Sequence, residues 1–427
     1  MRERAHFRWT VALPASTTVF LAGAVVAFNG CSADSAPATY TVRDSAGIEI
    51  VESSAPAWRD DEAWMLDRES VVEIGVQAGA PELLFSGITG VVVLEDGRIA
   101  VADRTSNQVR FFTPDGVFLE AFGRSGEGPG EFQYVRALGR CGADSLFVFD
   151  LDYRMVVLDA AGNHVREGRP YDLQRSLSGR PYSLSCSRNG HFAAVGWEAR
   201  TGPPTIGFYT ARAPVWILQP IGTDDSAATD VSDGAAFAMR AELGTFLSSE
   251  RIGHENGSGP HPFGRSLVLA ITDDALYLGE AASFELTEFT LDGAPQRIIR
   301  GPTLDLEIRA DHLEAYRVAQ LENAQSQNRP TLERYLRDLP LPPGFPAYTK
   351  LLVDPAGALW IRRFAPPGDD RHVWSVFDEH GVYLGDVDVP IELEITEIGS
   401  DHVAGVATDE LGVERARVYR LLKPTSL

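Results

Sequence analysis

The chain has 427 residues, 44% of them hydrophobic, and its 60 acidic residues outnumber 38 Lys and Arg to give a formal net charge of −22. This apolar content is sufficient for a large buried core. Such a negative charge repels nucleic acids and anionic lipid headgroups, so we expect neither as a partner.

The first 30 residues have the pattern of an export signal peptide. Arg2, Arg4 and Arg8 precede an apolar run from Val11 to Phe28. The run contains Pro and several hydroxyl side chains, which make it too polar for a permanent membrane span. We therefore predict that the protein is exported.

The apolar run ends in Phe28-Asn29-Gly30-Cys31. This ending resembles a bacterial lipobox, whose cysteine is lipidated, although Phe28 and Asn29 depart from the aliphatic and small residues of that pattern. We expect lipidation at Cys31, with ordinary secretion as the alternative. Residues 31–38 are small and polar and would form a tether. The expected location is the outer membrane through this anchor, or the periplasm, and otherwise the medium.

The stretch 88–132 contains short runs of strand-forming residues separated by turn sequences. Two of the turns contain Asp96-Gly97 and Asp115-Gly116, and Asp-Gly pairs accept the positive φ that tight hairpins need. The runs between them predict four antiparallel strands in about 40 residues, which is the spacing of a β-propeller blade.

Copies of this pattern recur along the chain. Aligned on the first apolar residue of the second strand, they fall at Ile99, Leu146, Phe192, Leu276, Leu359 and Val403. We therefore predict an all-β fold, a six-bladed β-propeller over residues 39–427. The two longest steps contain predicted insertions. Residues 221–264 are acidic and rich in Gly, Ser and Ala, and the leucine spacing within 304–348 indicates a short helical insertion.

The sixth copy ends near Leu422 without a fourth strand. The N-terminal sequence Asp44-Ser45-Ala46-Gly47, followed by IEIVE, resembles the last turn and last strand of the other copies. We predict that residues 47–52 complete the sixth blade and so close the ring, which removes exposed sheet edges. Residues 71–75 are a candidate for a further edge strand or a crossing between blades.

Two stretches carry a resemblance to a known repeat. The sequences VADRTSNQVRFFTPDG at 101–116 and FGRSGEGPGEF at 122–132 resemble the NHL repeat, in full over one blade and in fragments elsewhere. Asp103, Arg110 and Asp115 match positions of that repeat. We interpret them as structural residues, which cap turns and bond neighbouring blades.

A broader resemblance covers most of the chain. The sequences DSAGIEIVES at 44–53 and FPAYTKLLVDPAGALWI at 345–361 are similar to bacterial six-bladed propeller lipoproteins. This resemblance implies an envelope protein built as one propeller.

Cys141 and Cys186 lie at nearly equivalent ends of the first strands of consecutive copies. Export permits oxidation, so we predict a disulfide between them, with two buried thiols as the alternative. His254, Glu255 and His261 flank a Gly-rich loop and form a candidate metal site, with a solvated loop as the alternative. The expected metal and cofactor content is none, with calcium left open.

The sequence contains no HExxH, GxSxG or phosphate-loop motif. We predict a monomeric envelope protein that binds a small ligand or another envelope protein, at the channel mouth beneath the two insertions. A cationic ligand fits the net charge, and solubility alone also accounts for it. The alternative is a hydrolase or lyase, similar to propeller lactonases, that uses a metal in the channel.

Overall fold

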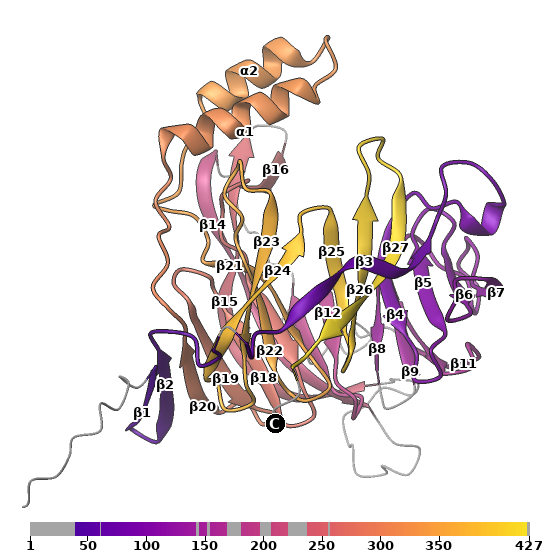
Figure 1. Cartoon of the computed structure of the whole chain (residues 1–427), viewed down its shortest axis with the longest axis horizontal. Helices are drawn as coiled ribbons and strands as arrows, with labels where there is room; N and C mark the ends of the chain where they lie inside the picture. Colours follow the sequence, from indigo (N-terminus) through magenta and orange to yellow (C-terminus); the bar gives the residue numbers. More distant parts are fainter. Residues whose placement is uncertain are drawn as a thin grey trace, which may run out of the picture. The chain divides into compact units, whose positions relative to one another are not determined.

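The computed structural model describes residues 39–59, 61–141, 145–151, 154–168, 181–196, 206–220, 237–254 and 257–424. Within these residues the strands form six sheets, which are the six blades of a β-propeller (Figure 1). The predicted fold class is therefore confirmed. The predicted signal peptide, the tether and Cys31 lie outside the described residues.

Blades 1, 2 and 5 are four-stranded antiparallel meanders, as predicted. Their strands are, in chain order, β4 (Ile88–Val93), β5 (Ile99–Asp103), β6 (Gln108–Phe112), β7 (Phe118–Phe122), β8 (Val135–Arg140), β9 (Ser145–Asp150), β10 (Met155–Asp159), β11 (His164–Gly168), β21 (Tyr348–Val353), β22 (Leu359–Arg363), β23 (Arg371–Phe377) and β24 (Tyr383–Pro390). The third turn of each contains a glycine in the left-handed region, where Gly116, Gly162 and Gly381 have φ of 80°, 83° and 83°.

Each blade buries its faces against the blades beside it. Phe111, Val148 and Leu158 belong to one buried cluster shared by blades 1 and 2. Trp360 and Trp374 of blade 5 belong to another cluster, which blade 6 completes. Because a single sheet leaves both of its faces exposed, packing of this kind is what makes the repeated unit stable.

Blade 3 differs from its prediction. Its strands are β12 (Pro181–Cys186), β13 (Phe192–Gly196), β14 (Gly207–Pro220), β15 (Phe237–His254) and β16 (Gly257–Pro260). Residues 221–264, predicted as an insertion, thus supply two strands of this sheet. The sequences GFYTA at 207–211 and VWILQP at 215–220 indicate two separate outer strands, but they form one long strand. Pro214 does not interrupt it, because Pro214 lies just beyond Val215, where pairing with β13 ends, and needs to pair only with β15.

The N-terminal hairpin joins blade 4. That blade consists of β17 (Val268–Ile271), β18 (Ala275–Gly279), β19 (Glu285–Thr290) and β20 (Pro295–Arg300). Strand β2 (Ile48–Ser53) pairs in parallel with β20, and β1 (Tyr40–Ser45) pairs with β2 at the outside. The prediction that residues 47–52 complete the sixth blade is therefore wrong. The Asp44–Gly47 turn forms a hairpin as predicted, but local turn chemistry does not determine which sheet a hairpin joins.

Another N-terminal strand closes the ring. Blade 6 contains β25 (Leu393–Ile398), β26 (His402–Thr408) and β27 (Glu414–Leu422). Its fourth strand is β3 (Met65–Ile74), which lies antiparallel to β27 along nearly its whole length (Figure 1). The candidate edge strand at 71–75 lies at the end of β3. Residues 65–74 and the last strand, β27, thus share one blade, and closure from the N-terminal side is confirmed with a different strand.

The segment between β2 and β3 contacts blade 5. The backbone N–H groups of Ala57 and Trp58 donate to carbonyls of Tyr383 and Leu384 on β24. The rings of Trp58 and Trp64 lie 5.1 Å apart, and Trp64 lies 5.7 Å from Trp360 of blade 5. Residues 48–74 therefore hold blades 4, 5 and 6 together from outside.

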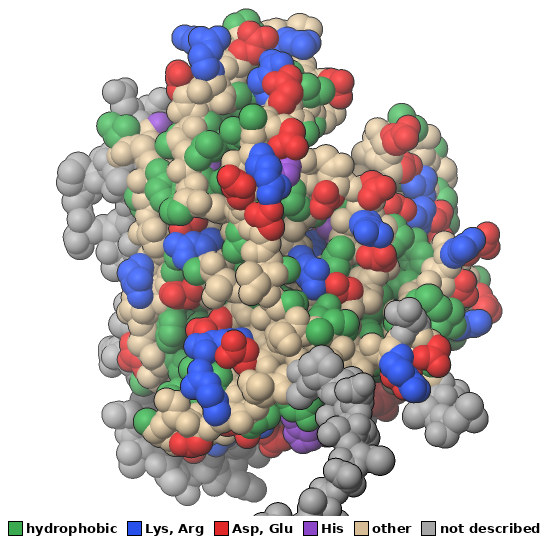
Figure 2. Space-filling model, turned by 60° about the vertical axis from the view of Figure 1, so that its left-hand side comes forward, with side chains coloured by type: hydrophobic (Ala, Val, Ile, Leu, Met, Phe, Trp, Pro, Cys, Tyr) green, Lys and Arg blue, Asp and Glu red, His purple; other side chains and the backbone are tan. Residues whose placement is uncertain are grey.

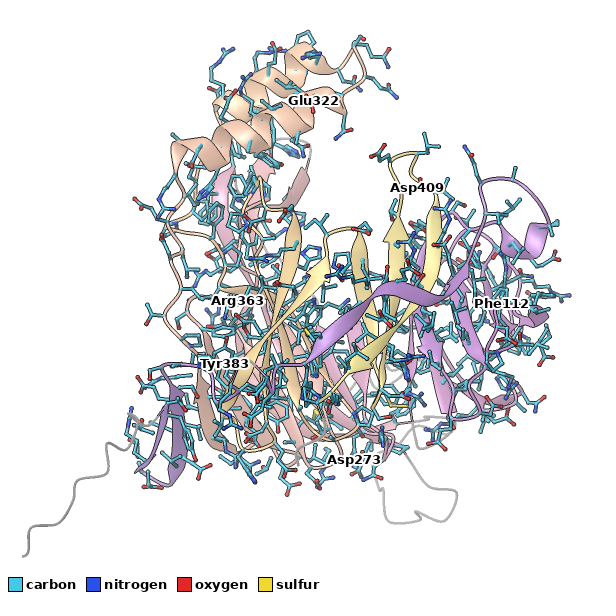
Figure 3. The ribbon with its side chains drawn as sticks, viewed as in Figure 1. Phe112, Asp273, Glu322, Arg363, Tyr383 and Asp409 are labelled. Carbon is cyan, nitrogen blue, oxygen red and sulfur yellow. A yellow bond between two sulfur atoms is a disulfide. The ribbon has the colours of Figure 1, made fainter. Side chains whose placement is uncertain are left out.

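The two ends of the channel carry different connections. Where the structure describes them, the turns between first and second strands and between third and fourth strands lie at one end, which we call the turn end and which includes Asp273 (Figure 3). The other connections lie at the opposite end, called the helix end, with α1 (Ala310–Glu322), α2 (Arg329–Arg337) and the turn containing Asp409. The insertion 304–348 lies at the helix end as expected.

The described residues of the other predicted insertion also reach the helix end, where His261 Nε2 lies 2.7 Å from the Pro340 carbonyl and the Phe263 ring lies 4.9 Å from the ring of Tyr316 in α1. Residues 221–236, which lie outside the described residues, connect β14 to β15 within blade 3. The prediction that both insertions lie at one channel mouth therefore holds for residues 257–264, although β15 and β16 are strands of blade 3 and not a separate insertion.

Candidate ligand-binding channel

The first strands of the blades line a central channel that contains two main cavities. The cavity at the turn end has a volume of about 710 Å³, and the cavity at the helix end has about 660 Å³. Leu184, Ser185, Leu351 and Leu352 line both, so the two cavities meet at this level. Volumes of about 300–1,000 Å³ are typical of small-molecule sites.

The helix-end cavity is lined by three cationic side chains from three blades. Arg136 comes from β8, Arg251 from β15 and Lys350 from β21. Among the described residues that line this cavity there is no Asp or Glu. A positive cavity in a chain with a net charge of −22 is a local reversal of the overall charge.

Arg136 and Arg251 have no carboxylate partner among the described residues. The Arg251 guanidinium donates to the Ser258 carbonyl at 3.1 Å, and its contacts with the hydroxyls of Ser249 and Ser258 are long, at 3.4 Å. Both arginines are half-buried. Partial burial of a cation without a counter-charge costs folding free energy. This cost makes the cavity a candidate for binding an anion.

Lys350 differs because blade 6 neutralises it. Its Nζ donates to Glu394 Oε1 at 2.6 Å, and Glu394 also accepts from Arg362. Burial lowers the pKa of Lys350 despite the nearby carboxylate. Burial by itself would raise the pKa of Glu394, but the charges of Lys350 and Arg362 outweigh it and the pKa is lowered. The Glu394 carboxylate therefore stays ionised, and its bonds to Lys350 and Arg362 link blade 6 to blade 5.

The turn-end cavity has the opposite charge balance. Six carboxylates line it, against three arginines; the carboxylates are those of Asp273, Asp274, Glu288, Asp354, Glu379 and Glu397. Two of the arginines are paired, with Arg140 at 2.5 Å from Glu397 and Arg297 at 2.9 Å from Glu288. The channel is therefore positive towards the helix end and negative towards the turn end.

A smaller cavity of about 300 Å³ lies between blades 5, 6 and 1. His372 and Thr89 line it, and His372 Nδ1 and Thr89 Oγ1 are buried without a hydrogen-bond partner among the described residues. Burial lowers the pKa of His372, and the adjacent Arg362 adds to this effect. The imidazole is thus held in its neutral form near neutral pH.

The two described residues of the candidate metal site, His254 and His261, bind separate partners. His254 is exposed at the end of β15, and its Nδ1 lies 2.8 Å from the Gly257 carbonyl. His261 is buried, with Nε2 2.7 Å from the Pro340 carbonyl and Nδ1 accepting from the Phe263 N–H. Glu255 lies outside the described residues. His261 is a core histidine with both nitrogens bonded, which corrects its candidacy as a ligand.

The structural interpretation of the NHL-like residues fits two of the three. Asp103 accepts hydrogen bonds from Thr105 and Ser106 in its turn, and Arg110 donates to the carbonyls of Glu82 and Leu84. These carbonyls belong to the segment that enters blade 1, which includes the 3₁₀ turn η1 (Pro81–Leu83). Asp115 is exposed in its turn.

Blade 2 repeats the same device. Arg154 donates to the carbonyls of Glu127, Gly128 and Glu131 in the Gly-rich segment that enters blade 2. The buried Asp150 accepts from the Arg154 backbone N–H at 2.9 Å. An arginine that binds the preceding linker is therefore a feature of two consecutive blades.

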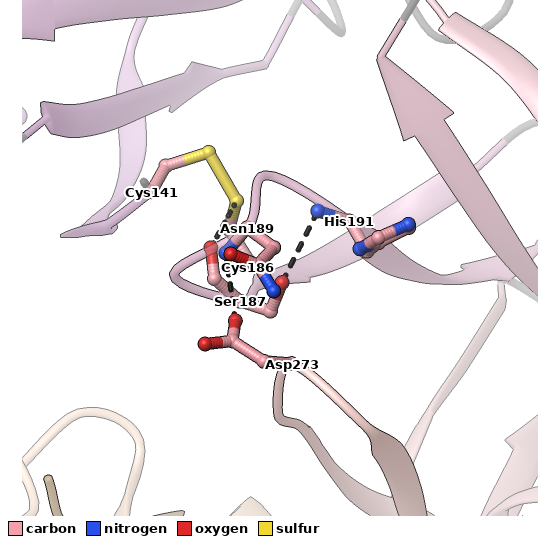
Figure 4. The surroundings of a disulfide bond; sticks show 6 residues. All are labelled: Cys141, Cys186, Ser187, Asn189, His191 and Asp273. Carbon is pink, nitrogen blue, oxygen red and sulfur yellow. Dashed lines mark hydrogen bonds between the residues drawn. A yellow bond between two sulfur atoms is a disulfide. The ribbon is translucent and has the colours of Figure 1, made fainter. Parts of the chain in front are cut away.

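The predicted disulfide is present. Cys141 and Cys186 are bonded, with their Cα atoms 5.1 Å apart, and the bond joins blade 2 to blade 3 at the turn end (Figure 4). Beside it, the Asn189 N–H of blade 3 donates to Asp273 of blade 4 at 2.7 Å (Figure 4). Three consecutive blades are thus cross-linked around this end of the channel.

The outer surface carries both signs of charge. On the face drawn in Figure 2, Lys and Arg side chains lie interspersed with Asp and Glu. Many of these groups are ion pairs, such as Arg300 with Glu285 at 2.7 Å. Among the residues that the structure describes, no group of three or more His, Cys, Asp or Glu could hold a metal ion, and no helix is long and apolar enough to span a membrane.

Comparison with known proteins gives the same fold. Residues 80–139 match the model of a family described as 6-bladed beta-propeller. No curated protein matches the chain. The chain is thus a six-bladed β-propeller protein. Its NHL-like character and its lipid anchor stay predictions.

Several solved structures are similar at low identity. One is a candidate exported protein from Bacteroides fragilis, with 10% identity, a TM-score of 0.42, and 86% of this chain and 97% of that chain covered. Another is virginiamycin B lyase from Staphylococcus aureus, with 10% identity, a TM-score of 0.37, and coverages of 83% and 99%. A third is regucalcin, a calcium-binding protein from Agrobacterium tumefaciens, with 12% identity, a TM-score of 0.38, and coverages of 83% and 97%. Likenesses of this degree carry no information about function.

Proposed function

We propose that this protein is an exported, lipid-anchored binding protein that holds a small ligand in the helix-end cavity of its propeller. The observation that carries the proposal is the cavity itself, about 660 Å³ in volume, with two arginines that have no carboxylate partner among the described residues and that lie among apolar and hydroxyl side chains. Concave sites with a mostly apolar lining and a few directed polar groups are typical of small-molecule binding. The proposal assigns binding and no reaction.

Binding in the channel is supported by the bonds that connect neighbouring blades and so fix the channel walls. The disulfide fixes blades 2 and 3, and the bond between Asn189 and Asp273 fixes blades 3 and 4. The N-terminal segment holds blades 4, 5 and 6, and β3 closes the ring. A cavity with rigid walls binds a ligand without the cost of ordering the site first.

Binding is tested with an uncharged fluorescent probe, N-phenyl-1-naphthylamine. Every protein in the experiment carries Cys31→Ser, so that no lipid or detergent competes for the probe. We expect saturable binding to this chain. Ser185→Trp places a large side chain where the two cavities meet, and we expect it to weaken binding at least about tenfold. Glu120→Trp adds the same side chain on the exposed strand β7 and serves as the matched control.

Absence of saturable probe binding, or equal binding by Ser185→Trp and Glu120→Trp, contradicts the proposed function. A thermal melt of each variant verifies that it is folded. Ser248→Trp, which fills the helix-end cavity from β15, repeats the test at a second position.

The lipid anchor has its own test. Cys31→Ala removes the thiol that a lipid would modify, and we expect the protein to move from the membrane fraction to the soluble exported fraction. If the distribution between the fractions does not change, the protein is not anchored through Cys31.

A further inference from the structure

We infer that the ligand of the helix-end cavity is an organic oxyanion whose charged group is bound by Arg136 and Arg251. This inference rests on the proposed function and names the chemical class of the ligand. The inferred ligand has a carboxylate, sulfonate or phosphate group attached to an apolar body.

The two arginines supply the charge. Each half-buried guanidinium is without a carboxylate partner among the described residues, while Arg140 and Arg297 in the turn-end cavity both have one. A guanidinium presents several N–H donors in a planar fork that matches two oxygens of an oxyanion. Arg136 and Arg251 come from blades 2 and 3, so a bound anion would contact both blades.

Hydroxyl groups surround these cations. Ser248, Ser249, Ser258 and Ser266 line the cavity at the helix end, and Ser185 lines it where the cavities meet. A hydroxyl donates to an oxyanion without adding charge. The long 3.4 Å contacts of Arg251 with Ser249 and Ser258 leave both groups able to form shorter bonds to a ligand.

The remaining wall is apolar. Leu184, Val195, Leu267, Leu269 and Leu351 line the same cavity. Burying an apolar body against such side chains contributes roughly 25 cal/mol per Å² of apolar surface. An inorganic anion would leave this wall in contact with water, so the inferred ligand has a non-polar part.

The net charge of −22 favours cations in bulk solution, but it does not decide what binds inside the channel. At physiological ionic strength, charges on the outer surface are screened beyond about 8 Å. The excess of carboxylates at the turn end, with six against three arginines, repels an anion arriving from that side. The ligand therefore enters from the helix end, beside α1 and α2.

The test compares two probes with the same aromatic body, again in the Cys31→Ser background. 8-Anilinonaphthalene-1-sulfonate carries a sulfonate, and N-phenyl-1-naphthylamine is uncharged. We expect the sulfonate to bind at least about tenfold more tightly. Arg136→Gln and Arg251→Gln should each weaken sulfonate binding about tenfold and leave the uncharged probe within about twofold. Arg43→Gln, on the exposed strand β1, removes the same charge elsewhere and should change neither probe.

The outcomes are distinguishable. Equal affinity for the two probes, with no effect of Arg136→Gln or Arg251→Gln, overturns the oxyanion inference and leaves the proposed function in place. If neither probe binds, or if Ser248→Trp leaves both unchanged, the proposed function fails and the inference fails with it. Stronger sulfonate binding that both arginine substitutions abolish, and that weakens as salt is raised, supports the inference.

Discussion

The Arg110 guanidinium lies 3.5 Å from the Asp103 carboxylate, and both side chains are buried within blade 1. The same guanidinium bonds two carbonyls of the segment that enters the blade, at 2.8 and 3.0 Å. Burial lowers the pKa of Arg110, and the adjacent carboxylate opposes this. One side chain thus joins a turn, a strand and a linker.

We predict that Arg110→Ala destabilises the protein by about 3–5 kcal/mol, because it leaves Asp103 as an unpaired buried charge and two carbonyls without donors. Arg110→Lys should also destabilise, since one ammonium cannot reproduce the planar fork. Chemical denaturation measures both effects. Arg68→Ala, on an exposed part of β3, is the control and should stay within about 0.5 kcal/mol. Equal stability of all three variants would contradict the assigned role.

Reduction of the disulfide is expected to destabilise blades 2 and 3. Cys141 and Cys186 are separated by 45 residues. Closing a loop of that length stabilises by about 4 kcal/mol in the chain-entropy model, and measured effects are typically about 2–4 kcal/mol. The unfolding midpoint in denaturant should fall when a reductant is added. The double variant Cys141→Ser/Cys186→Ser should show the lower midpoint with or without reductant, and a reductant effect that persists in it would have another origin.

Ring closure by β3 predicts a strong effect of Ile74→Ala. Ile74 is 2% exposed and packs with Phe85 and Ala416, which belong to the two sides of the closure. Removing a buried Ile side chain to Ala costs about 2–5 kcal/mol. Val42→Ala on β1, where the side chain is 53% exposed, should cost less than about 0.5 kcal/mol. Chemical denaturation compares the two, and similar small losses would place the closure elsewhere.

We predict that the free energy of unfolding decreases as the pH rises above about 6.5, because of His402. Burial alone would lower its pKa, but the carboxylates of Glu397, 3.8 Å from Nε2, and of Asp401, 3.0 Å from Nδ1, outweigh burial and raise the pKa. The folded state then binds more protons than the unfolded state, so this stabilisation is complete below a pH of about 6.5 and is lost as the pH rises through the raised pKa. His402→Gln should flatten the stability profile in that window.

Other histidines act in a different window. Burial lowers the pKa of His191, His261 and His372, so their effect is a loss of stability as the pH falls below about 6.5. Denaturation at a series of pH values separates the two effects. An unchanged decline above pH 6.5 in His402→Gln would show that another group causes it.

The repeated unit could be predicted from sequence because its signals are local. Asp-Gly and Asn-Gly turns, alternating apolar residues and the regular spacing of Ile99, Leu146 and Phe192 each depend on a few neighbouring residues. The disulfide was also predictable, since Cys141 and Cys186 occupy equivalent positions in consecutive copies. Residues at equivalent positions of consecutive repeats lie close together, so a repeat alignment predicts which residues are neighbours.

Pairings between distant segments were harder to predict. The hairpin of β1 and β2 has the turn chemistry of a blade, but its attachment to β20 depends on which sheet edge is open. The length of β14 was missed because Ala-Arg-Ala-Pro at 211–214 has the composition of a turn. The candidate site was missed for a related reason: Arg136 and Arg251 are far apart in sequence, and an arginine is ordinarily a surface residue. The available signal was β8 itself, in which Arg136 and Arg140 flank the small and apolar residues 137–139 of a strand that lines the channel.

The attachment of β2 to β20 also decides how the protein responds to tension. A pull on the backbone at residue 39 reaches the β1–β2 hairpin before it reaches the ring-closing strand. Because β2 and β20 run parallel, that load is shared as shear over several hydrogen bonds, and the Trp58 and Trp64 contacts come next in line. The propeller therefore has a clamp in series between residue 39 and the ring-closing strand β3, so that tension applied at residue 39 loads the β2–β20 pairing before it loads the closure.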